Sequence, residues 1–218
     1  MSYAQGLGWS RYLVTAVAVV SFAGCSKTSN PAAPAALGSV AGQESGAVKG
    51  DPGLGPDLAA VRAATAQFHQ VERAIEAGYQ DPAAGHCDQI AIGAMGIHSA
   101  NPALTQSQAI DPLRPEVLLY LPKEGGGFRL IGVEYVQTVL VRNPATGAVS
   151  PWMAQTPWPS NYTVVTPTPQ LFGQTFQGPM PGHVPGMPWH WDLHVWVWAN
   201  NPTGTFAQWN PAVSCPAH

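Results

Sequence analysis

Proline and glycine constrain this chain more than any other feature, because both interrupt regular secondary structure. The 218 residues include 22 prolines and 23 glycines. Residues 143–188 are so rich in proline that any strands there must be short and intermittent. Aromatic residues are nevertheless plentiful, with 8 tryptophans among them. The combination predicts a folded, loop-rich β domain rather than a disordered chain.

Charge excludes one class of partner. Charged residues make up 10% of the chain and the formal net charge is −3, so no basic surface of the kind that binds phosphate backbones is expected. Nucleic acid is therefore not an expected partner.

Residues 1–24 resemble the signal peptide of a bacterial lipoprotein. Arg11 closes a weakly basic start, and Tyr12 to Phe22 form an apolar run too short to span a bilayer comfortably. Ala23 and Gly24 then precede Cys25, as in a lipobox, although Phe22 stands where a leucine-like residue is usual. We expect export to the cell envelope and membrane attachment through lipid on Cys25. The alternative is an ordinary secretory signal with a chance cysteine.

The other two cysteines predict a disulfide. An exported chain meets an oxidising environment, and Cys87 and Cys215 remain once Cys25 carries lipid. A bridge between them would tie the C-terminal tail to the start of the domain and contribute about 2–4 kcal/mol. The alternative is that both thiols bind a soft metal.

Composition divides the mature chain in two. Residues 25–56 are rich in Ser, Ala, Gly and Pro and poor in large apolar residues, which predicts a flexible tether. Residues 57–218 form the predicted single α+β domain.

This domain is expected to begin with one amphipathic helix. Asp57 is its candidate N-cap, Gly78 its candidate C-terminal cap, and Pro82 prevents its continuation. One face carries apolar residues at helical spacing: Leu58, Val61, Phe68, Val71 and Ile75.

The rest of the domain is predicted to form strands. Pro115–Pro122 and Phe128–Val141 are apolar runs separated by a "KEGGG" turn, which predicts a β-hairpin. Trp189–Ala199 is the last strong strand. We predict an α+β fold in which the N-terminal helix packs on an antiparallel, loop-rich sheet of about four to six strands.

The last strand carries the most unusual residues. Side chains alternate between the two faces of a strand, so one face should be apolar and meet the helix: Trp191, Leu193, Val195 and Val197. The other face begins polar and ends aromatic: His190, Asp192, His194, Trp196 and Trp198. Such a polar trio points either into solvent or into a site.

A metal site is one hypothesis for this trio. His190 and His194 would be about 13 Å apart on a strand, so they cannot bind one ion together without further ligands. Three residues elsewhere could complete the set: His98 in a predicted Gly-rich loop, "GAMGIHSANP", Glu134 inside an apolar strand and, as a secondary candidate, His183 in a Pro-rich loop.

The ligand types indicate a divalent metal. Histidine with carboxylates suits zinc or iron, and histidine with methionine suits copper. Such a site could belong to a metal-assisted hydrolase or lyase, with Glu134 or Asp192 as base. The structural alternative is that each histidine makes an ordinary hydrogen bond and that Glu134 pairs with Arg129 or Arg114.

The order of motifs resembles an uncharacterised family of secreted bacterial proteins and lipoproteins. The resemblance rests on "MGIHSANP", "PEVLLYLP", "GVEYV", "HWDLHVWVW" and "NPTGTFAQWNPAVSC" and covers nearly all of residues 60–216. It implies one intact domain and carries no activity. A second function therefore stays open, a non-catalytic module that holds a carbohydrate or another small ligand on its tryptophan-rich face.

Overall fold

The computed structural model describes residues 55–216. The predicted signal peptide, lipidation at Cys25 and nearly all of the predicted tether lie outside these residues. Among residues 55–216, no helix combines the length and the apolar character needed to cross a membrane.

A six-stranded sheet organises the described residues, and every neighbouring pair of its strands is antiparallel. Its strand order is β1-β2-β3-β4-β11-β10. The strands are β1 (Asp88–Ile90), β2 (Gly93–Ala100), β3 (Val117–Pro122), β4 (Phe128–Thr138), β10 (Gln177–Met180) and β11 (His190–Val195). The prediction of a mixed α+β fold with an antiparallel sheet is confirmed.

The hairpin of β3 and β4 forms as predicted around the glycine-rich turn, with Pro122 opposite Phe128. A bulge between Leu119 and Tyr120 interrupts its register. The predicted strand through Val141 is divided, because β4 ends at Thr138 and β5 (Leu140–Arg142) pairs with other strands.

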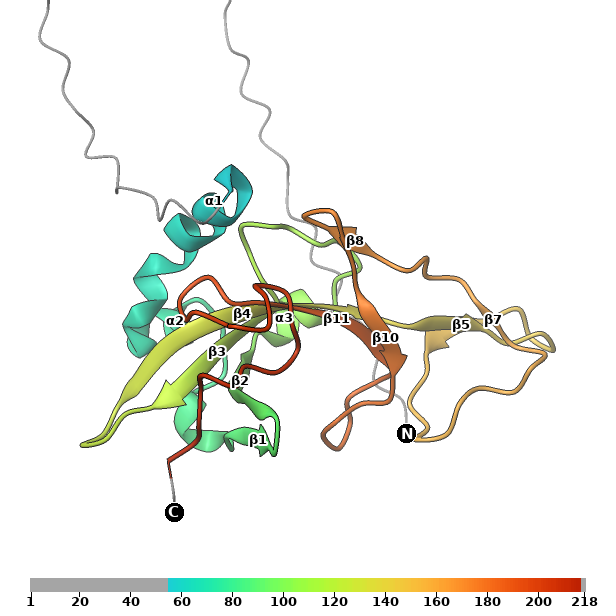
Figure 1. Cartoon of the computed structure of the whole chain (residues 1–218). Helices are drawn as coiled ribbons and strands as arrows, with labels where there is room; N and C mark the ends of the chain where they lie inside the picture. Colours follow the sequence, from blue (N-terminus) through green and yellow to red (C-terminus); the bar gives the residue numbers. More distant parts are fainter. Residues whose placement is uncertain (1–54, 217–218) are drawn as a thin grey trace, which may run out of the picture. The chain divides into compact units, whose positions relative to one another are not determined.

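The proline-rich region forms only short strands, as predicted. A three-stranded sheet contains β5, β6 (Val149–Pro151) and β7 (Thr163–Val164), and a two-stranded sheet contains β8 (Gln170–Leu171) and β9 (Gln174–Thr175). The three-stranded sheet lies beyond the end of β4 (Figure 1).

The N-terminal helix is not continuous, which the sequence did not predict. It consists of α1 (Pro56–Thr65), the 3-10 turn η1 (Ala66–His69) and α2 (Val71–Glu76), with Gln70 extended between them. The hydroxyl of Tyr120 donates a 2.6 Å hydrogen bond to the carbonyl oxygen of Phe68 at this break. The break also changes the buried face, so that Ala74 is buried while Ile75 is 43% exposed.

The start of α1 also differs from the prediction, by two residues. The helix begins at Pro56 with Gly55 as its N-cap, and Asp57 lies in the first turn. Proline suits this position because it lacks only an N–H that would have no helical partner. Two further short helical turns are η2 (Pro82–Ala84) and α3 (Pro102–Thr105).

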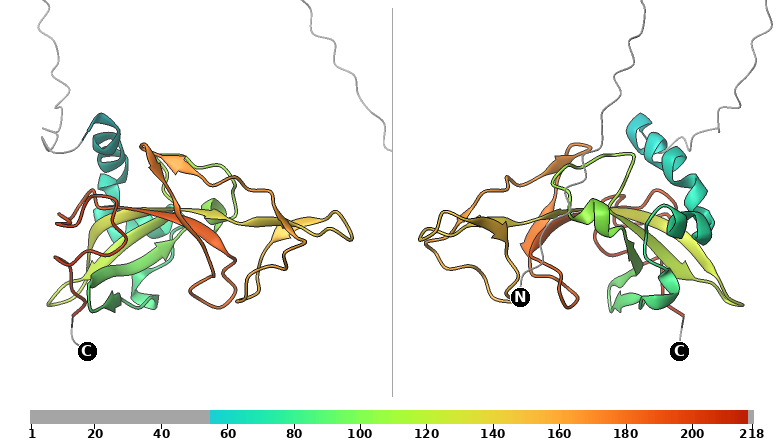
Figure 2. Two further views of the ribbon diagram at one scale, coloured as in Figure 1. Left: turned by 45° about the vertical axis from the view of Figure 1, so that its right-hand side comes forward. Right: turned by 180° about the vertical axis from the view of Figure 1, so that it is seen from behind.

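The sheet has a buried cluster on each face. Successive residues of a strand belong to different clusters, because their side chains alternate between the two faces. Leu118 and Leu193 belong to the larger cluster, which also includes Val61 of α1. Leu119 and Trp196 belong to the smaller one. The helices α1 and α2 lie on one side of the sheet, and the end of the C-terminal tail and the loop from β10 to β11 lie on the other (Figures 1 and 2).

Trp198 does not follow the predicted alternation. Because β11 ends at Val195, the chain turns, and the Trp198 indole donates to the Thr65 hydroxyl at 3.1 Å. Its ring lies 4.3 Å from that of His69 and 4.8 Å below the Arg62 guanidinium. Trp198 thus packs against α1 and η1 instead of beside His194.

The disulfide between Cys87 and Cys215 is confirmed. It joins residues 128 positions apart in the sequence and attaches the C-terminal tail to the chain directly before β1.

Candidate metal centre

Three neighbouring parts of the sheet bring His98, Glu134 and His194 together. Glu134 lies on β4 directly opposite His194 on β11. On its other side Glu134 faces Val117 of β3, and His98 reaches over β3 from β2. His98 therefore lies in a strand, not in the loop predicted from its neighbouring glycines.

The position of His98 depends on one of those glycines. Gly96 has φ +87°, and a Cβ there would lie 2.5 Å from the carbonyl oxygen of Tyr120. Glycine therefore allows β2 to approach β3 closely two residues before His98.

The distances among the three side chains are too long for ordinary hydrogen bonds. His98 Nε2 lies 3.6 Å from Glu134 Oε2, and His194 Nε2 lies 4.0 Å from Glu134 Oε1. One ligand atom from each residue lies within 4.8 Å of the others. Ligand atoms bound to one tetrahedral zinc ion are about 3.3 Å apart, given bonds of about 2.0–2.1 Å. A small contraction would therefore place all three around one ion.

Two of the three ligand candidates are buried. Glu134 is 4% and His194 is 2% exposed, whereas the side chain of His98 is 26% exposed. Buried charged groups require compensation, and the open edge at His98 is where a small molecule or ion could enter.

The ring of His98 is oriented by Asp88. Its Nδ1 lies 3.0 Å from Asp88 Oδ2, so the Nδ1–H donates to this carboxylate and Nε2 is left facing Glu134. Histidines that bind metals commonly donate their second ring N–H to a carboxylate in this way. The other oxygen of Asp88 lies 2.7 Å from Nε2 of the exposed His86.

Several buried polar atoms around this cluster have no hydrogen-bond partner among the described residues. They are Nδ1 and Nε2 of His194, Oδ1 and Oδ2 of Asp192, and Nε2 of His190. Such atoms are rare in folded proteins, and an ion or ordered water is a common explanation. The cluster therefore has atoms that could bind a metal ion or ordered water.

Burial raises the pKa of both acidic groups. Glu134 has a pKa of about 8, because burial disfavours its charge more than attraction to His98 favours it, and the neighbouring Asp192 raises the pKa further. Asp192 has a pKa of about 6, again mainly because of burial. In the metal-free protein, Glu134 is therefore mostly protonated at neutral pH.

The histidines divide into two groups. Burial alone would lower the pKa of His98, but the carboxylates of Glu134, Asp88 and Asp192 raise it above its usual value. Burial lowers the pKa of His190 to about 4 and holds that of His194 well below its usual value. Neutral imidazole is the form that binds metals, so His194 is already suited to be a ligand.

Other predicted residues lie beside the three-residue cluster. Asp192 Oδ2 is 3.9 Å from His194 Nδ1. His190 lies further along β11, where its Nδ1 is 3.2 Å from the Pro188 carbonyl oxygen and its ring is 5.0 Å from that of His183. His183, His190 and Asp192 are thus neighbours of the cluster but do not belong to the group able to hold one ion.

Glu134 lies near His98 and His194 rather than pairing with Arg129 or Arg114, and no sequence pattern distinguished between these partners. Sequence reasoning also missed His86 and Asp88. The signal available for Asp88 was its place directly after Cys87, which the disulfide holds in position.

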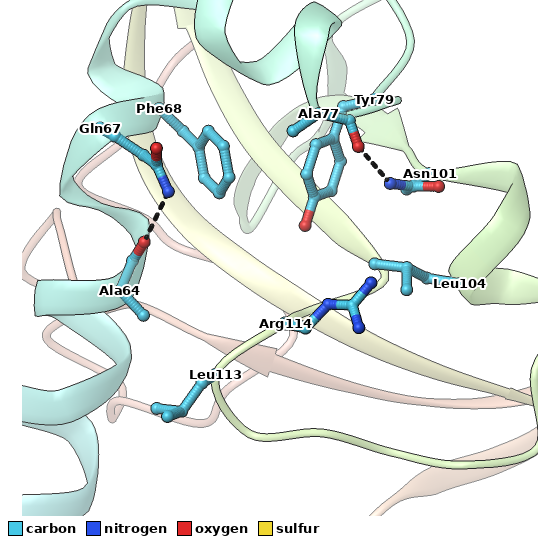
Figure 3. A pocket seen from close by; sticks show the side chains of 9 residues that line it. All are labelled: Ala64, Gln67, Phe68, Ala77, Tyr79, Asn101, Leu104, Leu113 and Arg114. Carbon is cyan, nitrogen blue, oxygen red and sulfur yellow. Dashed lines mark hydrogen bonds between the residues drawn. The ribbon is translucent and has the colours of Figure 1, made fainter. Parts of the chain in front are cut away.

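A separate pocket lies on the helical side of the molecule. Its volume is about 300 Å³, and Figure 3 shows Arg114 extending across it towards Leu104. Its lining includes Phe68 and Tyr79 of the larger buried cluster and none of the histidine and carboxylate residues described above.

Comparison with known proteins does not identify the chain, since no protein family, curated protein or solved structure matches it.

Proposed function

We propose that this domain binds one divalent transition metal ion through His98, Glu134 and His194. The observation that carries the proposal is the meeting of these three groups, two of them buried, from three strands at distances of 3.6 and 4.0 Å, too long for hydrogen bonds. The unpartnered nitrogens of His194 and oxygens of Asp192 support it.

The donor set favours zinc or iron over copper. Two imidazoles and one carboxylate form the ligand set of several catalytic zinc sites and of many non-haem iron enzymes. Copper sites with methionine would need a thioether beside the histidines. Met187 packs against the smaller buried cluster, and the three proposed ligands include no thioether.

Asp192 is the candidate base beside this centre. An ion with an open coordination position supplies Lewis-acid activation of water or of a substrate carbonyl. Asp192 is fully buried and neither of its oxygens has a partner among the described residues, so it can accept a proton there. A metal-assisted hydrolase or lyase acting on a small substrate fits this arrangement.

The tryptophan-rich face gives less support to a carbohydrate module. Trp189, Trp191 and Trp196 are 8%, 3% and 3% exposed, and stacking on a sugar requires an open ring face. These three rings act as core residues.

We also propose that the chain is exported and attached to the envelope membrane through lipid on Cys25, with residues 25–56 as its tether. The disulfide between Cys87 and Cys215 supports an oxidising location.

Metal binding to tag-free protein tests the proposal. After removal of bound metal, Zn²⁺ and Fe²⁺ should bind to the wild type at one ion per chain. Glu134→Gln preserves shape but removes the anionic ligand, so its affinity should fall by at least the roughly 10- to 100-fold typical of losing a residue that only supports a ligand.

Glu124→Gln is the matched control, because Glu124 lies in the exposed β3–β4 turn, and it should bind like the wild type. A wild-type protein that binds neither metal, or a Glu134→Gln variant that binds equally well, would contradict the proposal.

A further inference from the structure

We propose that Asp88 is a positioning residue for the metal ligand His98 and that the disulfide between Cys87 and Cys215 keeps Asp88 in place. Metal affinity then depends on the disulfide being formed. The inference rests on the proposed metal site and names a form of its regulation.

The first step is the contact between Asp88 and His98. Asp88 Oδ2 lies 3.0 Å from His98 Nδ1, while Nε2 on the opposite side of the ring faces Glu134. The hydrogen bond therefore selects both the rotation of the ring and the tautomer whose free nitrogen points into the centre.

The second step is that β1 would be held by few contacts without the disulfide at Cys87. This strand has three residues, lies at the edge of the sheet and is mostly exposed. Its pairing with β2 is irregular between Asp88 and Gln89. So short and open a strand has few contacts of its own to hold a carboxylate in position.

The third step is that the C-terminal tail supplies the missing support. Cys87 directly precedes Asp88 and is bonded to Cys215. The Cys215 backbone N–H donates a 2.6 Å hydrogen bond to Gln89 Oε1, and residue Asn210 of the same tail pairs with Ala94 at the start of β2. The tail thus holds β1 on both sides of Asp88.

The consequence is a link between redox environment and metal binding. In a reducing compartment the thiols would be free, Asp88 would be poorly held, and the centre would bind metal weakly. Oxidation of the two thiols by an external disulfide or thiol oxidase, which takes up two electrons and two protons, would complete the site.

The test compares Zn²⁺ affinities, measured by competition with a chromophoric chelator. Asp88→Ala should weaken binding by about 10- to 100-fold, the effect expected for removing such a supporting carboxylate. Asp88→Asn, which keeps an acceptor oxygen, should recover part of this loss. Asp81→Asn is the matched control, because the Asp81 carboxylate only accepts a local hydrogen bond from Ala83 N.

Cys87→Ser/Cys215→Ser should weaken binding to a similar extent, and combining it with Asp88→Ala should add little further loss. Fully additive losses, or wild-type affinity in the folded double variant, would overturn the link.

If the double variant does not fold, Gln89→Ala replaces it, since this change keeps the disulfide and removes one contact with the tail. It should also weaken binding, and unchanged affinity would count against the link.

A measurement without metal separates this inference from the proposed function. Nitrogen-15 NMR of the neutral His98 ring should report Nδ1–H in the oxidised wild type and a mixture of tautomers in Asp88→Ala. If the wild type binds no Zn²⁺ but shows the single tautomer, the proposed function fails and the positioning role stands. Mixed tautomers in the wild type would refute that role.

Discussion

The protonation of Glu134 should make the proposed metal binding depend on pH. Its pKa of about 8 means that the metal-free side chain is mostly protonated at pH 7, whereas a ligand must be a carboxylate. Binding at pH 7 should therefore release about one proton from Glu134, and His98, whose pKa is also raised, should add to the release. Affinity should rise with pH up to about 8, where Glu134 is half ionised. Calorimetry in buffers of different ionisation enthalpy measures this release, and a heat that is the same in all buffers would count against it.

Glu116 gives a pH-dependent prediction away from the centre. It is 2% exposed, accepts a hydrogen bond from Val136 N, and burial raises its pKa to about 7. Because the folded-state pKa is raised, its stabilising contribution is complete below the unfolded value of 4.5 and is lost as pH rises to about 7.

Glu116→Gln should abolish this loss. Relative to the wild type, the metal-free variant should gain on the order of 1–3 kcal/mol in free energy of unfolding between pH 5 and pH 8. Urea unfolding at the two pH values measures the gain, and Glu124→Gln should show none. An equal pH dependence in Glu116→Gln and the wild type would show that this carboxyl titrates normally.

At this scale the sequence identified most of the relevant residues. A glutamate inside an apolar strand and a polar trio on a tryptophan-rich strand are visible without a structure, because burial of such residues requires partners. Asp88 was not visible, because an aspartate in a turn-like stretch has many ordinary explanations.

The β2 strand depends on close approach to β3 at Gly96. Gly96→Ala and Gly125→Ala form a matched pair, since both residues have positive φ (+87° and +85°) but only Gly96 faces neighbouring atoms within 4 Å. Both changes should cost about 1–2 kcal/mol of backbone strain. Gly96→Ala should cost a further 1–3 kcal/mol or so from overpacking. Denaturant unfolding measures both values, and equal losses would mean that the close approach has no energetic importance.

Elements with local signals were predictable and others were not. The β3–β4 hairpin was predictable, because a glycine-rich turn separates two apolar runs. The break at Gln70 was not predictable, because the hydrogen bond at this break joins Phe68 to Tyr120, 52 residues further along the sequence. The departure of Trp198 from the face of β11 likewise depends on its distant partner Thr65.

For the whole molecule, metal binding should stabilise the fold. A ligand present at 100 times its dissociation constant adds about 2.7 kcal/mol, which for a domain of this size raises the melting temperature by about 5–10 °C. Scanning calorimetry with and without Zn²⁺ measures the shift in wild type and Glu134→Gln. The variant should show little shift, and an equal shift in both proteins would place the bound metal elsewhere.

The disulfide should contribute to stability independently of metal. It closes a loop of 128 residues in sequence separation, so Cys87→Ser/Cys215→Ser should lower the free energy of unfolding by about 2–5 kcal/mol. Metal-free urea unfolding measures this, and reduced wild type should match the variant. A loss well below this range would mean that the denatured chain is not constrained by the bridge.

The convergence of the centre is a property of the whole molecule. The sequence separates His98, Glu134 and His194 by dozens of residues, and only the strand order β2-β3-β4-β11 brings them together. No local pattern encodes which of several polar residues meet, which is why His190 was a candidate beside His194 and His183 a secondary one.

The most direct measurement is a crystal structure of the disulfide-bonded protein grown with Zn²⁺, with diffraction data above and below the zinc absorption edge. We predict one strong anomalous peak bonded to His98 Nε2, a Glu134 carboxylate oxygen and His194 Nε2 at about 2.0–2.2 Å. Ordered side chains in these positions with no peak between them, or a peak bound by other residues, would contradict the account.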